Sequence, residues 1–163
     1  MAADLENTLY FDVPAGRVVI EMRPDLAPEH VAQIKALARR GFYDGVPFHR
    51  VIDGFMAQTG DPTGTGAGGS GHKLKAEVSN EKHVRGILSM ARASDPNSAD
   101  SQFFIMFGPA PSLDGQYTIW GKVTSGMEYI DQIKKGDPAR NGSVTNPDKI
   151  VKMQVAADAE KAK

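Results

Sequence analysis

A chain of 163 residues has the size of one domain and is long enough to bury about two thirds of its unfolded surface in a single core. Its 19 basic and 20 acidic residues leave a net charge of −1, and no run of Lys or Arg exceeds a pair, so we expect no nucleic-acid partner. The chain has no cysteine, so disulfides, thiol nucleophiles and thiolate metal sites are excluded as well.

The first segment, residues 1–7, is acidic and lacks the basic and apolar parts of a secretory signal. No apolar run reaches the roughly 18 residues that a membrane-spanning helix needs. We therefore expect a cytoplasmic protein with no membrane partner.

Residues 8–13 and 16–22 are rich in β-branched and aromatic side chains and are joined by a Pro-Ala-Gly turn, which predicts an opening β-hairpin. A helix is predicted over 28–40, because proline suits the first helical turn and two arginines followed by Gly41 suit the last. Its apolar stripe is too narrow for a fully buried helix, so we expect it to lie across one edge of a sheet or barrel.

Residues 48–61 consist of two apolar-rich runs separated by an Asp-Gly pair, which predicts a second hairpin. Two registers compete: a two-residue loop pairs His49 with Gln58, whereas a three-residue loop pairs Arg50 with Gln58. We favour the second register because it places a guanidinium opposite an amide that accepts its hydrogen bond. The result is one fixed cation beside apolar surface.

The glycine-rich loop (residues 62–72) has no periodicity and almost no apolar side chains, so we predict a mobile loop with nothing apolar to pin it to the core. Residues 64–69 match the G-x-G-x-x-G pattern of dinucleotide sites. That site requires a strand before the match and a helix after it, and neither is predicted here. His72 also stands where a phosphate-binding loop needs lysine. We expect no nucleotide cofactor.

The remaining chain alternates short strands with Gly/Pro turns. Further strands are predicted at 87–91, 102–107, 118–123 and 150–156. A second helix is expected to start at a capping box formed by Ser125 and Glu128 and to end at Gly136. The residues from 158 to 163 have too little apolar content to pack.

These elements amount to about eight strands and two helices in a single domain over residues 1–163, with a core at about 8–156 and a short tail at 157–163. We predict a mainly β fold, a closed eight-stranded antiparallel barrel capped by two α-helices. Closure is the economical arrangement because it removes exposed strand edges.

Signatures of hydrolysis and of metal binding are missing from the sequence. Ser89 and Ser101 lack the G-x-S-x-G nucleophile motif, and the four histidines lack a ligand spacing such as H-E-x-x-H. Arginine, amide and aromatic side chains bind and polarise a substrate but do not readily supply a nucleophile or a general base. We therefore expect neither a metal nor a cofactor.

Three sequence blocks, in order and at the right separations, resemble the cyclophilins, a family of cyclosporin-binding peptidyl-prolyl cis/trans isomerases. The blocks are FHRVIDGFMAQTGD at 48–61, GILSMAR through SQFFI at 86–105, and LDG through WGKV at 113–123. The first departs from the usual FHR-hydrophobic-hydrophobic-x-GFM-x-Q-GGD form by Thr59 in place of a glycine. The resemblance runs over about residues 8–155 and implies the same barrel fold.

Rotation about a prolyl amide suits this set of residues, because a catalyst needs only to stabilise the twisted amide, whose nitrogen regains a lone pair. Arg50 is the expected donor to that nitrogen, with Gln58 as the second catalytic residue. The resemblance implies a substrate-binding set that comprises Phe55, Met56, Ala91, Arg92, Gln102, Phe104, Leu113 and Tyr117.

Some of these residues also have structural interpretations. Phe104 and Leu113, taken alone, would be interpreted as core residues, because large apolar side chains are usually buried. His49 reads as a core histidine satisfied by backbone, and it stays outside the catalytic set. Ser112 stands where cyclosporin-sensitive cyclophilins carry tryptophan, and Tyr117 stands where many carry histidine, a pattern also seen in bacterial members.

The favoured function is thus a peptidyl-prolyl isomerase that assists protein folding and acts on proline-containing peptides and on unfolded or folding proteins. The alternative is a non-catalytic proline-binding module of the same fold, but such a module has no need of a donor to the proline nitrogen. We expect a monomer that binds cyclosporin weakly.

Overall fold

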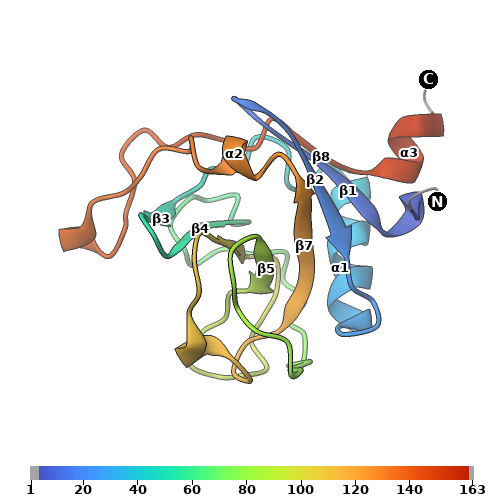
Figure 1. The fold of residues 1–163 in the computed structure, drawn as a ribbon, viewed down its shortest axis with the longest axis horizontal. Helices are drawn as coiled ribbons and strands as arrows, with labels where there is room; N and C mark the ends of the chain where they lie inside the picture. The colour runs from blue at the N-terminus through green and yellow to red at the C-terminus, as the bar shows by residue number, and fades with distance from the viewer. Residues whose placement is uncertain (1–3, 162–163) are drawn as a thin grey trace.

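The computed structural model describes residues 4–161. One sheet of eight antiparallel strands forms the body of the protein, in the order β3-β4-β6-β5-β7-β2-β1-β8 (Figure 1). The strands are β1 (Thr8–Val13), β2 (Gly16–Met22), β3 (Arg50–Ile52), β4 (Met56–Thr59), β5 (Ile87–Met90), β6 (Phe103–Met106), β7 (Ile119–Ser125) and β8 (Lys152–Val155). Each predicted strand position holds a strand, so the mainly β class is confirmed.

The sheet curls but does not close as a strand ladder. β3 and β8 stand at the two ends of the strand order, and no ladder joins them within residues 4–161. Irregular chain spans the gap: the N–H of Phe48 donates to the carbonyl of Asp148 at 2.9 Å, and the N–H of Ile150 donates to that of Val46 at 2.9 Å. Pro47, between these contacts, has no N–H with which to extend a ladder. The expected closed barrel is not confirmed, and the sheet is an open, curled half-barrel.

The first predicted helix is α1 (Pro28–Arg39), which packs against β8 at the edge of the sheet, as expected (Figure 1). Its first turn receives no side-chain cap from the preceding residue. The carboxylate of Glu77 accepts instead from the backbone N–H groups of Glu29 at 3.2 Å and His30 at 2.9 Å. These bonds satisfy helix donors that have no partner within the helix.

The second predicted helix is much shorter than expected. α2 comprises only Met127–Ile130, and its N-cap is Gly126 with no side-chain cap bond, so the predicted capping box is wrong. Gly126 has a φ of 87°, and a Cβ there would lie 2.6 Å from the carbonyl oxygen of Arg17. This close approach to β2 requires glycine and fixes how the chain enters the helix.

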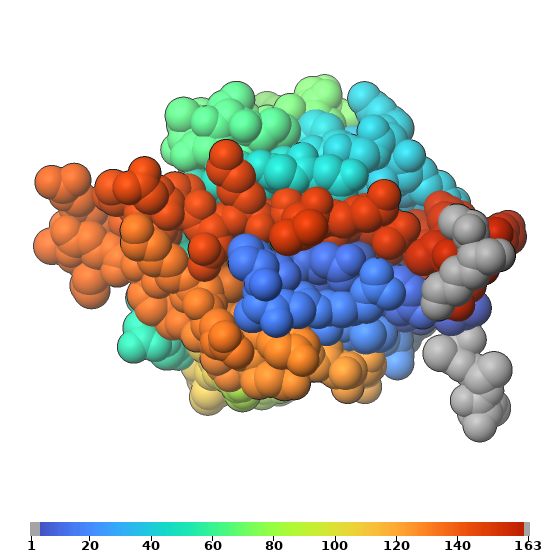
Figure 2. All heavy atoms as spheres, turned by 90° about the horizontal axis from the view of Figure 1, so that it is seen from above, coloured from blue at the N-terminus to red at the C-terminus, as the bar shows by residue number. Residues whose placement is uncertain are grey.

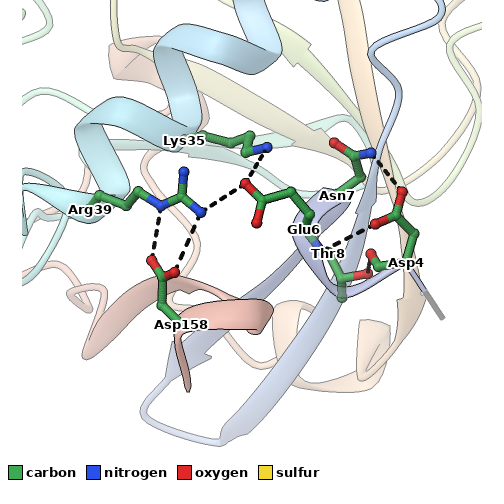
Figure 3. A network of polar contacts seen from close by, with 7 residues as sticks. All are labelled: Asp4, Glu6, Asn7, Thr8, Lys35, Arg39 and Asp158. Atoms are coloured by element: carbon green, nitrogen blue, oxygen red, sulfur yellow. Dashed lines mark hydrogen bonds and ion pairs between the residues drawn. The ribbon is translucent and has the colours of Figure 1, made fainter. Parts of the chain in front are cut away.

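The C-terminal residues form a helix, α3 (Ala156–Lys161), although their low apolar content predicted that they would not pack. β8 and this helix run beside the N-terminal hairpin (Figure 2). A polar network holds α3: Arg39 bonds Asp158 at 2.9 Å and Glu6 at 2.8 Å, and Lys35 bonds Glu6 at 2.8 Å (Figure 3). The expectation of an unpacked tail is wrong for residues 158–161, because Asp158 is bound to Arg39 of α1, which also bonds Glu6 of the 3₁₀ turn η1 (Leu5–Asn7). Residues 162–163 of the predicted tail lie outside the described residues.

This network makes a pH-dependent contribution to stability. Hydrogen bonds from Lys35 and then Arg39 lower the pKa of Glu6 from 4.5 to about 2. A carboxylate whose pKa is depressed in the folded state stabilises the fold above its unfolded pKa, and that stabilisation is lost as the pH falls through the folded pKa. We expect Glu6→Gln to lower the melting temperature slightly at neutral pH, and the difference from wild type to shrink as the pH falls from 4.5 toward 2.

Thermal unfolding followed by circular dichroism across this pH range measures the effect. Glu128→Gln, on α2 and outside the network, is the control. A difference between wild type and Glu6→Gln that stays constant with pH would contradict the prediction.

Candidate active site

The hairpin β3–β4 pairs Arg50 with Gln58 and Ile52 with Met56, which confirms the register that the sequence favoured. The N–H of Phe55 donates to the carbonyl of Ile52 at 3.0 Å and closes the three-residue turn. Arg50 and Gln58 therefore face each other on one side of the ladder.

Three hydrogen bonds fix the guanidinium of Arg50. Nη1 donates to Gln58 Oε1 at 3.1 Å, Nε donates to the carbonyl of Asn141 at 2.9 Å, and Nη2 donates to Asn141 Oδ1 at 3.1 Å. All three acceptors are neutral. Burial lowers the pKa of Arg50 below its ordinary value, yet arginine remains protonated at neutral pH. The site thus holds an oriented positive charge.

Asn141 is not among the predicted site residues and lies 91 residues from Arg50 along the chain. It is the C-cap of the 3₁₀ turn η3 (Pro138–Arg140) and has a φ of 58°. Asparagine tolerates this left-handed conformation better than most residues. The Asn-Gly turn signal at 141–142 is visible in the sequence, but nothing there links it to Arg50.

A chain of amides continues from Arg50 to the glycine-rich loop. Gln58 Nε2 donates to Gln102 Oε1 at 2.9 Å. Gln102 Nε2 donates in turn to the carbonyls of Gly66 at 2.8 Å and Gly68 at 3.0 Å. With both amide nitrogens engaged in this way, the oxygen of Gln58 faces Arg50.

The glycine-rich loop is pinned by polar contacts rather than apolar ones. The carboxylate of Asp61 accepts from the N–H groups of Thr63 at 2.8 Å, Gly66 at 2.6 Å and Gly68 at 3.0 Å. Burial raises the pKa of Asp61, but the bonds from the Thr63 hydroxyl and the loop amides outweigh it and hold the pKa well below its ordinary value. The expectation concerned apolar contacts only, and these polar bonds do not contradict it. Its mobility and its failure to bind nucleotide stay predictions.

A pocket of about 220 Å³ with both apolar and polar walls opens beside Arg50. It is lined by Arg50, Phe55, Met56, Gln58, Ala91, Arg92, Phe104, Leu113 and Tyr117. Every predicted site residue except Gln102 lines this pocket, and Gln102 is hydrogen-bonded to Gln58. Gln102 lines an adjoining cavity of about 340 Å³ whose wall also includes Gln58, Ala91 and Arg92.

Phe104 lines the pocket and is only 5% exposed. It belongs to a small apolar cluster with Met56 and Met106, separate from the main core. Tyr117 meets its ring edge-on at 5.9 Å between centroids, and the guanidinium of Arg92 lies 4.4 Å above the Tyr117 ring. Phe104 is therefore both a core residue and a pocket residue.

His49 lies outside the pocket lining, but its environment differs from the expected one. Its Nδ1 is buried without a hydrogen-bond partner among the described residues, so the expected satisfaction by backbone is not confirmed. Burial lowers the pKa of His49. This favours the neutral ring.

Two further features of residues 4–161 bear on function. No group of three or more His, Cys, Asp or Glu side chains there is placed to hold a metal ion. None of the helices in this range has the length and apolar character needed to cross a membrane.

Comparisons with known proteins agree with this geometry. Residues 8–155 match the model of the family described as cyclophilin type peptidyl-prolyl cis-trans isomerase/CLD. A probable peptidyl-prolyl cis-trans isomerase of Brucella suis is 56% identical over 98% of this chain and 87% of its own length. Peptidyl-prolyl cis-trans isomerase B of Bacillus subtilis is 46% identical over 80% of this chain and 93% of its own.

Solved structures give the same assignment. The cyclophilin AquaCyp293 of Hirschia baltica superposes with a TM-score of 0.85 at 29% identity, over 97% of this chain and 77% of its own. A Cryptosporidium parvum cyclophilin, crystallised in the presence of the dipeptide Ala-Pro, superposes with a TM-score of 0.82 at 33% identity, over 91% of this chain and 98% of its own. The chain therefore belongs to the cyclophilin-type peptidyl-prolyl cis-trans isomerases, enzymes that catalyse rotation about Xaa-Pro peptide bonds.

Proposed function

We propose that Arg50 catalyses this rotation by donating a hydrogen bond to the proline nitrogen, while the apolar pocket holds the proline ring. The rotational barrier of about 18 to 20 kcal/mol arises from resonance between the nitrogen lone pair and the carbonyl. Twisting the amide breaks that resonance and returns the lone pair to nitrogen. A donor fixed at this position stabilises the twisted state more than the planar one, which lowers the barrier.

The proposal rests on one observation: the guanidinium of Arg50 is held by neutral acceptors and still has N–H groups free of these bonds. A guanidinium has five N–H bonds. Gln58 accepts one bond, from Nη1, and Asn141 accepts two, from Nε and Nη2, so each terminal nitrogen keeps one N–H for substrate. The charge is held in place by neutral oxygens, and no carboxylate among its partners in the described residues neutralises it.

The residues that line the two cavities suggest where the other parts of the substrate bind. Phe55, Met56, Phe104 and Leu113 would contact the proline ring. Ala91 and the backbone of Arg92 would receive the residue before proline. Gln58 and Gln102 would orient the substrate backbone, because their amides are already fixed by the chain of hydrogen bonds that ends at the glycine-rich loop.

The partners supported by this site are proline-containing peptides, including those of unfolded or folding proteins. The Ala-Pro dipeptide used with the Cryptosporidium relative supports this class of ligand. We place a single isomerase domain over residues 1–163, with its core at about 8–156. The monomeric state and the cytoplasmic location stay predictions from the sequence.

Exchange NMR on an Ala-Pro-containing peptide tests the proposal. Catalysis raises the cis/trans exchange rate at catalytic amounts of protein. The alternative, a binding module without catalysis, shifts the peptide resonances in a saturable way but leaves the exchange rate unchanged. That outcome would overturn the catalytic role of Arg50.

Cyclosporin should bind this protein more weakly than it binds cyclophilins that carry tryptophan at the position of Ser112. Ser112 is exposed on the 3₁₀ turn η2 (Pro111–Leu113), beside pocket residue Leu113. A missing indole removes apolar contact area and an N–H donor, a loss of about 1 to 3 kcal/mol in binding free energy. Isothermal titration should show tighter binding by Ser112→Trp and no gain by Ser112→Ala. A nanomolar Kd for the unmodified protein would contradict the prediction.

Activity should need no metal and should change little between about pH 6 and 8, because the proposed step moves no proton. Burial lowers the pKa of both His49 and His83, so these buried rings stay neutral over most of this range. The exchange rate, measured with and without EDTA and across this pH range, is the test. A tenfold loss in EDTA, or a bell-shaped profile centred near the ordinary pKa of histidine, would contradict the mechanism.

A further inference from the structure

His83 is buried behind the proline pocket and is not part of its lining. Its backbone N–H donates to Asp114 Oδ1 at 2.7 Å, and its carbonyl accepts from the N–H of Ala110 at 2.9 Å. Ring atom Nδ1 lies 3.1 Å from Asp114 Oδ1, and Nε2 lies 2.9 Å from Ser89 Oγ. The backbone N–H, the carbonyl and both ring nitrogens of His83 thus all contact residues in or next to segments that contribute to the pocket lining.

Asp114, His83 and Ser89 are arranged in the order of a hydrolytic triad, but they cannot act as one. Ser89 is 0% exposed, and its Oγ lies 3.0 Å from the carbonyl of Thr118. A nucleophile must reach the substrate, and this hydroxyl is fully buried on β5, where Ser89 pairs with Phe104 across the β5–β6 ladder. The cluster therefore has another role.

The ring of His83 contacts two aromatic residues that line the pocket, Phe104 and Tyr117. Its ring stacks on Phe104 with centroids 6.2 Å apart and meets Tyr117 edge-on at 6.5 Å. Asp114 directly follows Leu113, and Ala110 starts the turn that carries Leu113, because the N–H of Leu113 donates to the carbonyl of Ala110 at 3.0 Å. One buried ring thus connects η2, β5 and two pocket aromatics.

We propose that His83 is a positioning residue that sets the shape of the proline pocket, holding Leu113 through Asp114 and supporting Phe104 from behind. The inference rests on the proline pocket of the proposed function. His83 is thereby assigned to substrate binding, whereas Arg50 lowers the barrier to rotation of the prolyl amide.

The two ring contacts are unequal. A carboxylate only accepts hydrogen bonds, so Nδ1 carries the proton that faces Asp114. The single hydroxyl proton of Ser89 has two acceptors within reach, His83 Nε2 and the carbonyl of Thr118. Burial lowers the pKa of His83 against the opposing effect of Asp114, and the neutral ring with the proton on Nδ1 fits both observations. The bond to Asp114 is the one that positions the pocket.

The test measures KM and kcat separately for an Xaa-Pro peptide. We expect His83→Leu to raise KM by about tenfold or more and to change kcat less than about threefold. His83→Asn keeps an N–H donor near the position of Nδ1 and should stay within about threefold of the wild-type KM, whereas His83→Gln should not. Asp114→Ala should raise KM as much as His83→Leu, and the double variant should raise it no further. His72→Asn, at an exposed histidine, is the control.

An unchanged KM in His83→Leu, or a loss confined to kcat, would overturn the proposal. If His83→Leu does not fold, the comparison of the Asn and Gln variants decides, because equal or reversed effects on KM also overturn it. A failure of the catalytic role of Arg50 would show in kcat of the Arg50 variants, so the two failures are distinguishable.

Discussion

Arg50→Ala should remove most of the catalysis while the fold and much of the affinity for proline remain. Uncatalysed exchange takes roughly 10 to 100 s, so exchange in milliseconds requires a barrier lower by about 5 to 7 kcal/mol. A charge-assisted hydrogen bond contributes about 1.5 to 3 kcal/mol net, and more in a groove with little water. Arg50 accounts for a major share of the reduction, and the pocket supplies the rest by holding and desolvating the amide.

The measurement is kcat/KM on an Xaa-Pro peptide, with circular dichroism and peptide affinity as checks on the fold and on binding. Arg50→Lys should recover only part of the loss, because a point charge on a flexible stem cannot bond Gln58 and Asn141 as a planar guanidinium does. Arg17→Ala, which removes an arginine paired with Asp12 at the surface, is the matched control.

Asn141→Gly tests whether the orientation of the guanidinium matters. Glycine keeps the left-handed backbone and the carbonyl that accepts from Nε, and removes only the Oδ1 contact of Nη2. An intermediate loss is expected, mainly in kcat.

The contradicting outcome for Arg50→Ala is a kcat/KM that stays above about a third of the wild-type value, a change below about 1 kcal/mol in barrier height. In that case Arg50 is structural and the proposed mechanism fails.

Phe103→Ala should have the second large effect, and it should act on stability rather than on the pocket. Phe103 is 0% exposed and its ring meets Trp120 at 5.3 Å, Tyr43 at 5.5 Å and Phe11 at 6.0 Å between centroids. Removing a buried phenyl ring leaves a cavity that the surrounding rings fill only in part. We expect the free energy of unfolding to fall by about 3 to 5 kcal/mol, from a total of about 5 to 15 kcal/mol for a typical domain.

The neighbouring Phe104 provides the comparison, because successive residues of β6 point to opposite faces of the sheet. Phe104→Ala opens the pocket and should raise KM strongly. Phe103→Ala should keep a KM near that of the wild type at a temperature where it stays folded. Urea unfolding and peptide kinetics on both variants distinguish the two roles. A stability loss below about 1.5 kcal/mol for Phe103→Ala would show that the core collapses around the missing ring.

The sequence by itself determined the features that adjacent residues encode. Strand-forming residues and turn chemistry located the eight strands and α1. The Asp-Gly signal located the second hairpin, and the match of a guanidinium with an amide selected the register that pairs Arg50 with Gln58. The cyclophilin-like blocks named the residues that gather around one pocket. These signals are readable because strand periodicity, turn conformation and hairpin register depend on residues close together in the chain.

Only the tertiary structure decided contacts between segments that are distant in the chain. Asn141 reaches Arg50 across 91 residues, Asp114 reaches His83 across 31, and Asp158 reaches Arg39 across 119. The open edge of the sheet and the early end of α2 likewise depend on where other segments pass. Such contacts follow from the complete path of the backbone, because a polar side chain bonds whichever partner the fold brings within reach, and its local sequence does not specify that partner.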